Sequence, residues 1–410
     1  MRIYDIAIIG AGASGMAAAI TAFERDPSLR IVILECNDEP GRKISATGNG
    51  HCNLSNTACE NYIGTLSFFE RLGLITRIDE EGRIYPYSME AEDVRRALVS
   101  GIERSNVEFE YSTRVTDIVA ESTYEKTSLP GTCGDSSEGK KLAICSASTI
   151  ENKKTDYEFK ILTNRGEFKS RKILISTGGK AGAQFGSKGD GYIFARKLGH
   201  SVSRLAPALT SIETVEDTSS IAGVRFPALV KLFRSDNEIF REIGRLQFTD
   251  YGLSGICIMN MTSFMRFPDD RKTSDGMKDL SISVDIVPDF DDVYARIPDH
   301  IKNGFDALFS IAPHKLSTYI SKLSCDKASS AAQMARDLRF TPKKLRGWQY
   351  AQVTSGGVSC DEFDSETMES KICRGLFFAG EVIDYDGSCG GFNLQNAWET
   401  GIKAGEGMSR

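Results

Sequence analysis

The sequence predicts an α/β fold, and three observations lead to this prediction. The chain opens with an Ile-rich segment, Ile3 to Ile9, followed at once by a glycine-rich turn and an Ala-rich run. It ends with a short apolar segment, a second glycine-rich loop and a run with helical spacing. Between these ends, residues from about 201 to 345 change in character, with strand-like runs before helical ones. Strands that alternate with helices are typical of a parallel sheet covered by helices.

Composition narrows the class of protein. At 410 residues the chain is too long for one ordinary core, so two or three domains are expected. A charged content of 26% and a hydrophobic content of 40% are typical of a globular protein, and we expect a cytoplasmic one. The net charge of −6 argues against nucleic acid or an anionic membrane as the main partner, because both favour a basic face. The oligomeric state is not indicated.

Cysteines and histidines give no metal prediction. None of the ten cysteines forms a CxxC pair, so neither a dithiol redox motif nor a zinc knuckle is present. Scattered unpaired cysteines suggest a reducing compartment. Four histidines leave little material for a histidine-rich centre. Ile6 to Phe23 has 18 residues without a charge, yet glycines in its middle favour a strand, a turn and a helix over a membrane span.

The first glycine-rich segment predicts a dinucleotide site. GAGASG contributes Gly10 for a tight turn, Gly12 for close approach of a pyrophosphate, and Gly15 for close packing of helix and strand. Arg30 to Leu34 is a second apolar strand that ends at Glu35, twenty residues beyond Gly15. The Glu35 carboxylate would accept hydrogen bonds from ribose hydroxyls and would repel a 2′-phosphate. The segment alone does not choose between FAD and NAD.

The far end of the chain favours a flavin. Leu376 to Ala379 is a short apolar strand, and Gly380 and Glu381 follow it. A glycine-rich loop then leads through Gly391 into a helical run that starts near Asn393. A reduced flavin carries negative charge that backbone N–H groups of Phe392 and Asn393, at a helix start, would stabilise.

These motifs resemble those of the YhiN-like flavoproteins, a family that includes bile-acid double-bond reductases and aminoacetone-oxidase-like enzymes. The matching segments are GAGASG (10–15), GRKISATGNGHCNLSN (41–56), ILISTGG (173–179), GSKGDGY (186–192), FTDYGLSG (248–255), VTSGGV (353–358), TMESK (367–371) and GLFFAGEVIDYDGSCGGFNLQNAWETG (375–401). They occur in the family's order across nearly the whole chain. The resemblance implies a glutathione-reductase-like Rossmann domain that binds FAD non-covalently, with a second domain inserted into it.

The resemblance also implies roles for single residues. Ala13, Ser14 and Glu35 would lie near the pyrophosphate and ribose, and Arg42, Lys43 and Asn53 would lie along the cofactor. The backbone of Val115 would lie near the adenine, and Thr177 and Gly178 would lie where the chain returns to the cofactor. The residues near the ribityl and isoalloxazine parts would be Gly380, Glu381, Gly391, Phe392 and Asn393. This chain departs from the family by having His51 where Arg is usual, Asp250 where His is common, and Ile256 where Pro is common. The first two changes exchange charge near the presumed pocket, so they bear on which substrate this chain binds.

The expected domains are a discontinuous FAD-binding domain (1–200 and 346–410) and an inserted substrate or cap domain (201–345). The insertion is expected to be β-rich over about 201–288 and helical over about 289–345. In the first domain, Val107 to Ala120 and Phe159 to Ser176 are expected to be strands, joined by a polar hairpin extension from about 121 to 156.

The candidate catalytic residues are His51, Cys52 and Tyr251. An imidazole beside a thiol could activate it as a nucleophile. Adjacent side chains in an extended loop point apart, however, which favours a structural or cofactor-packing role for the pair. His51 could also attach FAD covalently. Tyr251, with Asp250, could donate or relay a proton, or could pack in a tight turn.

The main functional hypothesis is an FAD-dependent oxidoreductase that passes hydride from NAD(P)H, through the flavin, to a small organic substrate such as an activated C=C bond. No second GxGxxG is present, so NAD(P)H would bind transiently. The alternatives are an amine or alcohol oxidase that uses O₂, an RNA-modifying flavoprotein, and a non-catalytic FAD-binding protein.

Overall fold

Segments from both chain ends build the first sheet. The computed structural model describes residues 3–122, 157–265, 277, 279–288, 291–325 and 327–410. The parallel strands are, in spatial order, β6 (Glu108–Glu110), β2 (Ile31–Leu34), β1 (Ile3–Ile9), β9 (Gly166–Ile175) and β19 (Leu376–Phe378). The Ile-rich β1 lies between β2 and β9, as expected of a strand buried on both faces. Antiparallel β8 (Tyr157–Thr163) and β7 (Val115–Ser122) extend the same sheet.

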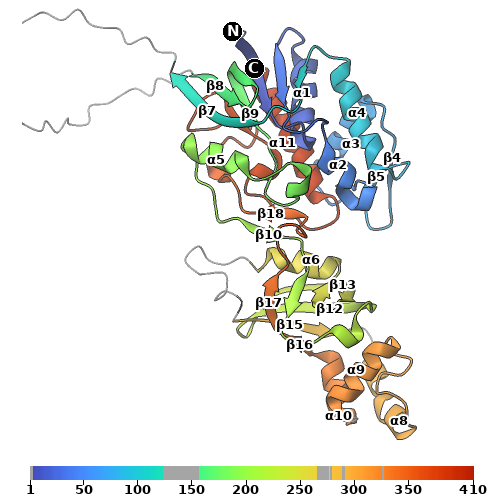
Figure 1. Ribbon diagram of the computed structural model, residues 1–410. Coiled ribbons are helices and arrows are strands. Elements are labelled where there is room, and N and C mark those ends of the chain that lie inside the picture. The colour runs from blue at the N-terminus through green and yellow to red at the C-terminus, as the bar shows by residue number, and fades with distance from the viewer. Residues whose placement is uncertain (1–2, 123–156, 266–276, 278, 289–290, 326) are drawn as a thin grey trace, which may run out of the picture.

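Helices cover this sheet, and one pair connects the two ends of the chain (Figure 1). The helices of this part are α1 (Ala13–Arg25), α2 (Arg42–Ala46), α3 (Tyr62–Arg71), α4 (Ala91–Glu103), α5 (Asp190–Lys197) and α11 (Phe392–Met408). A small sheet of β3 (Ser55–Asn56), β5 (Arg83–Pro86) and β4 (Thr76–Ile78) lies beside them. A Cβ on Gly405 would lie 2.5 Å from the Ala18 carbonyl oxygen, and one on Gly401 would overlap the Ser14 carbonyl oxygen. Only glycine lets α11 approach the α1 backbone this closely.

A second hydrophobic core lies under an antiparallel sheet in the middle of the chain. The strand order is β16 (Leu338–Phe340), β15 (Leu280–Asp285), β12 (Arg225–Arg234), β13 (Asn237–Phe248), β14 (Gly252–Ser254), β11 (Ile212–Thr214) and β17 (Pro342–Leu345). The associated helices are α6 (Ile256–Ser263), α7 (Asp291–Tyr294), α8 (Ile297–Lys302), α9 (His314–Ser324) and α10 (Ala328–Arg336). We refer to this part as the cap.

The chain passes between the two cores twice, and the two passages are paired. β10 (Ala206–Ala208) leads into the cap and β18 (Val353–Ser355) leads out of it. They form a two-stranded antiparallel sheet, with Ala206 opposite Ser355 and Ala208 opposite Val353. Figure 1 shows this ribbon between the upper and lower parts of the molecule. The division into a discontinuous domain (1–200 and 346–410) and an insertion (201–345) stays a prediction.

Two of the expected strands are wrong in extent. The segment 107–120 contains two strands, because Ser112 takes a positive φ of 51° and its N–H donates to the Asn37 carbonyl oxygen. The segment 159–176 contains a hairpin, because Asn164 and Arg165 form a turn before Gly166 at φ 126°. In both segments the alternating sequence pattern continues through polar residues that form a turn in the structure, so the pattern alone does not show where the strands end. Residues 123–156, which include most of the expected hairpin extension, lie outside the described residues.

The insertion also departs from the expected order of a β-rich part followed by a helical one. Residues 338–345, expected to be helical, form β16 and β17: Leu338 and Phe340 are buried and Arg339 is exposed, which is strand alternation. Pro342 starts an edge strand, where a missing N–H is tolerated. Conversely, α6 lies within the range expected to be β-rich.

His200 is buried and joins three segments of the chain. Ser370 Oγ accepts hydrogen bonds from the N–H groups of Ile372 and Cys373, so its own hydrogen is free to donate to His200 Nε2, 2.9 Å away. His200 Nδ1 then carries the ring proton and donates to a Glu362 carboxylate oxygen at 3.1 Å. This network requires a neutral imidazole.

We expect His200 to make the protein less stable in acid. Burial lowers the pKa of His200 below its ordinary 6.5, against the opposing effect of Glu362. As the pH falls, the unfolded chain therefore takes up a proton that the folded chain resists. The contribution of His200 to stability is full above its ordinary pKa of 6.5 and is lost as the pH falls through and below that value. The Tm of wild-type protein should fall between about pH 7.5 and about pH 5.5, and less so in His200→Gln. His314→Gln, at an exposed position, should keep the wild-type fall, and equal falls in all three proteins would contradict this assignment.

Candidate active site

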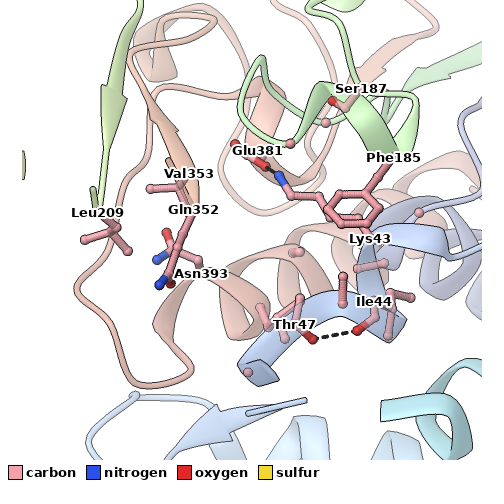
Figure 2. A pocket seen from close by; sticks show the side chains of 18 of the residues that line it. Lys43, Ile44, Thr47, Phe185, Ser187, Leu209, Gln352, Val353, Glu381 and Asn393 are labelled. Carbon is pink, nitrogen blue, oxygen red and sulfur yellow. Dashed lines mark hydrogen bonds and ion pairs between the residues drawn. The ribbon is translucent and has the colours of Figure 1, made fainter. Parts of the chain in front are cut away.

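One large cavity connects both chain ends with the cap. Its volume is about 1090 Å³, above the range of about 300–1,000 Å³ typical of pockets for one drug-sized ligand. The glycine turn after β1, the α2 region and the 387–391 loop line one part, and residues of β12, β13 and α6 line another. Figure 2 shows Lys43 and Glu381 on one side of this space and Leu209 and Val353 on the other. The cavity therefore has room for an extended ligand and a second molecule.

The glycine turn has one position that faces the cavity and one that is structural. A Cβ on Gly12, whose φ is −84°, would meet no heavy atom within 4 Å, and the residue lines the cavity. A Cβ on Gly15 would overlap the Gly10 carbonyl oxygen, and Gly15 does not line the cavity. Gly12 thus leaves space for a ligand beside the start of α1, and Gly15 leaves space for the protein backbone.

Glu35 holds the turn in place from the end of β2. Its carboxylate is buried and accepts a hydrogen bond from Ala11 N–H at 2.8 Å through Oε2. Its Oε1 accepts from the N–H and the side-chain amide of Asn37, both at 2.8 Å. Oε2 therefore retains capacity for a further donor, and the residue lines the cavity. This geometry suits recognition of ribose hydroxyls.

An ion pair connects the N-terminal and C-terminal parts across the cavity wall. Lys43 Nζ lies 2.6 Å from Glu381 Oε2 and also donates to the Ala181 carbonyl oxygen at 3.1 Å. Glu381 Oε1 accepts from Thr354 N–H at 2.8 Å, which fixes the carboxylate against β18. In Figure 2 the two side chains point toward one another. The sequence predicted both residues for the site, but not that they would pair.

The loop before α11 is held by Asn393. The helix begins at Phe392 without a side-chain cap, so its first N–H groups remain available. Asn393 Oδ1 accepts from Gly387 N–H at 2.9 Å, and Nδ2 donates to the Gly387 carbonyl oxygen at 2.7 Å. Nearby, Asn53 Oδ1 is buried, has no hydrogen-bond partner among the described residues and belongs to a cavity-lining residue. This oxygen is therefore free to accept a hydrogen bond from a polar group of a ligand.

These features fit FAD. The starts of α1 and α11 both border the cavity, so two helix N-termini favour negative charge in it, and phosphates and a flavin both supply such charge. Glu35 would hold the ribose, Gly12 would admit the pyrophosphate, and Asn53 Oδ1 would meet a donor of the flavin portion.

The structure brings together most of the residues predicted for the site. The cavity is lined by Gly10, Gly12, Ala13, Ser14, Glu35, Arg42, Lys43, His51, Asn53, Val115, Thr177, Gly178, Glu381, Gly391 and Asn393. It is not lined by Gly15, Cys52, Tyr251, Gly380 or Phe392. A Cβ on Gly380 would overlap Ser14 Oγ, so Gly380, like Gly15, lets elements pack closely.

Two of the candidate catalytic residues are not at the cavity. Cys52 is fully buried, and burial raises the pKa of its thiol to about 12, which fits the packing role better than an activated thiolate. Tyr251 lies in the turn between β13 and β14, with the Arg346 guanidinium 4.1 Å from its ring centre, a placement that fits the packing alternative. His51 is exposed at the cavity, and its Nδ1 lies 2.7 Å from the Met89 carbonyl oxygen.

Sequence reasoning missed the cap side of the cavity. The lining residues there include Leu209, Arg225, Glu242, Arg245, Gln247, Ile256, Met259, Asn260, Gln352 and Val353. Asn260 Oδ1 accepts from Cys389 N–H at 2.8 Å, and its Nδ2 donates to Glu242 at 2.9 Å, so the cap is hydrogen-bonded to the 387–391 loop. Strand alternation could have grouped Arg225 with Arg245, but nothing in the sequence indicates which edge of the cap meets the cavity.

In the part of the chain that the structure describes, no group of three or more His, Cys, Asp or Glu side chains is arranged to hold a metal ion. Within the same residues, no helix has the length and apolarity needed to cross a bilayer.

The fold and the cavity define a Rossmann-type flavoprotein, and comparison with known proteins gives the family. Residues 135–407 match the family model described as HI0933-like protein Rossmann domain. The "3-dehydro-bile acid delta(4,6)-reductase" of Clostridium scindens is 30% identical, over 98% of each chain. The chain therefore belongs to the HI0933-like family and is an FAD-dependent oxidoreductase, as the resemblance in the sequence implied.

Other relatives carry a different name. The "Ribosomal RNA dihydrouridine synthase" of Escherichia coli is 25% identical over 98% of this chain and 96% of its own length. That of Haemophilus influenzae is 24% identical over 98% of each chain. Among solved structures, an E. coli quinol fumarate reductase aligns with 100% of this chain and 70% of its own, at 14% identity and a TM-score of 0.47.

Gly12→Val should remove FAD binding and keep the fold. The added side chain has an allowed backbone conformation and occupies the space left for the pyrophosphate, so the FAD Kd should rise at least about tenfold. Flavin absorbance of the purified protein and titration with FAD measure this. Gly347→Val is the matched control, because a Cβ there is also unobstructed but lies away from the cavity. Unchanged FAD affinity in Gly12→Val would rule out the assigned pyrophosphate position.

Cys52 should not react with iodoacetamide in the native protein near neutral pH. Its thiol is buried and protonated, whereas Cys325 is exposed and serves as the internal reference. Peptide mass spectrometry after a short labelling pulse would give the two modification rates. Labelling of Cys52 as fast as that of Cys325 would restore it as a candidate nucleophile.

Proposed function

We propose that this protein reduces a ring carbon–carbon double bond conjugated to a carbonyl group in a small organic substrate, with NAD(P)H as electron donor. The names of the relatives support this reaction type. One is named for reduction of a dehydro-bile acid, and the others for making dihydrouridine, a nucleoside whose base has one ring double bond saturated. Their substrates differ, so the shared step is the addition of two hydrogens across a ring double bond.

The observation that carries the proposal is the continuity of the cavity from Glu35 to the cap. When bound, FAD supplies the two-electron chemistry, and the protein contributes position and environment. Leu209, Met259 and Val353 form an apolar part of the wall, which suits the face of a ring and excludes water. Because one glycine-rich fingerprint is present and FAD takes it, the nicotinamide would enter the open part of the cavity transiently.

The cap would set the substrate against the 387–391 loop. Asn260 accepts a hydrogen bond from the Cys389 N–H and so connects α6 to this loop. Asn393 holds the other end of the loop by its hydrogen bond with Gly387. A ring held between Met259 and Val353 would therefore keep a defined position relative to the start of α11. Positioning of this kind is a large part of what a protein adds to cofactor chemistry.

A second candidate function is RNA modification, because two relatives are named as ribosomal RNA dihydrouridine synthases. The net charge of −6 works against binding a polyanion, although local basic side chains occur on the cap. Oxidation of an amine or alcohol with O₂ is the third. We also propose a cytoplasmic location, on the ground that the eight described cysteines are all free.

Anaerobic reduction followed by re-oxidation tests the proposal. NADH or NADPH should bleach the flavin band of the holoprotein, and a steroid enone should restore it with formation of the saturated ketone, seen by mass spectrometry. Gly12→Val protein without FAD is the control for turnover that does not use this site. Re-oxidation by ribosomal RNA but not by the enone would favour the second function, and reduction by an amine or alcohol with re-oxidation by O₂ would favour the third.

A further inference from the structure

Two arginines on the cap lack partners where they meet the cavity. Arg225 lies on β12 and Arg245 on β13; Arg225 is opposite Gln247, and Arg245 is opposite Pro227. The two arginines are therefore diagonal neighbours on one face of the antiparallel pair, within reach of long side chains. Both are exposed and both line the cavity. Within the described residues, neither side chain has a hydrogen bond or an ion pair.

The other two arginines on the same face, Arg241 and Arg339, are paired. The Arg241 side chain forms two hydrogen bonds with the Glu238 carboxylate, and Arg339 Nε lies 2.6 Å from Asp337. Those residues do not line the cavity. Among the arginines of this face, the two without a partner in the described residues are thus the two that line the cavity.

Glu242, the acidic residue nearest to them in sequence that lines the cavity, is already engaged. Both of its carboxylate oxygens accept from Asn260 Nδ2, at 3.1 and 2.9 Å. Side chains alternate between the two faces of a strand, and Glu242 and Arg245 are an odd number of residues apart on β13. The Glu242 side chain therefore points to the opposite face of the sheet. Arg225 and Arg245 place two like charges at diagonal positions, and no acid among the described residues forms an ion pair with either. An anion from outside the chain would offset this charge.

We propose that Arg225 and Arg245 bind the carboxylate of the substrate. This inference rests on the proposed function, and it narrows the substrate to a ring enone with an acidic side chain. The apolar wall at Leu209, Met259 and Val353 takes the rings, and the two guanidinium groups offer paired donors suited to a carboxylate. The Gln247 amide, opposite Arg225, adds a neutral donor at the same place.

A matched pair of ligands tests the subsite: a cholenoic acid that carries a ring enone, and its methyl ester. Each is titrated into oxidised holoprotein, and Kd is read from the change in flavin absorbance. The wild type should bind the acid at least about tenfold more tightly than the ester. Arg225→Gln and Arg245→Gln should each raise the Kd of the acid about tenfold and that of the ester less than about twofold. Lys231→Gln, on the same face but away from the cavity, should change neither.

Equal binding of acid and ester by the wild type would overturn the proposal, as would equal losses for both ligands in the arginine variants. Loss of affinity for a short RNA oligonucleotide in these variants, with binding of the acid unchanged, would assign the arginines to phosphate and also overturn it. Binding to oxidised protein requires no turnover. Arginine-dependent binding of the acid without its reduction would therefore leave the subsite in place and refute the proposed reaction alone.

Discussion

The close contact between α1 and α11 is the constraint on which the site depends. These helices come from opposite ends of the chain, and Gly401 and Gly405 let one backbone lie against Ser14 and Ala18 of the other. The contact places both helix starts at one cavity, where their partial positive charges act on the same ligand. A larger side chain at either glycine would push α11 away and separate the two N-termini. Packing between chain ends thus determines the electrostatics of the cofactor site.

The cap is attached to the cofactor side by specific polar contacts as well as by the paired strands. Asn260 lies between Glu242 of the cap sheet and the N–H of Cys389 in the glycine-rich loop. Lys43 and Glu381 join the two ends of the chain on the other side of the cavity. These contacts make the wall of the cavity a composite of elements far apart in sequence, so substrate contacts on the cap have a defined relation to the cofactor.

Features that depend on local sequence were predictable, and features that depend on contacts between distant segments were not. The turn at Gly12 and the acid at Glu35 have a fixed spacing with a physical reason, and the structure places both at the cavity. The pairing of Lys43 with Glu381 depends on how α2 meets the C-terminal part, which no spacing encodes. Cys52 looked reactive because adjacency to His51 is visible in sequence and burial is not. The interruption of β-structure at Ser112 required a backbone conformation that its residue type rarely adopts.

The paired passages β10 and β18 have a mechanical consequence. Two independent linkers would allow the cap to twist and slide, but strands hydrogen-bonded in register, from Ala206 with Ser355 to Ala208 with Val353, bend as one ribbon. A ribbon flexes easily across its faces and resists bending within its plane. Any opening of the cap would therefore be a hinge rotation about a single axis. The amplitude of that rotation would limit the size of the molecule able to enter without breaking the hydrogen bond between Cys389 N–H and Asn260 Oδ1.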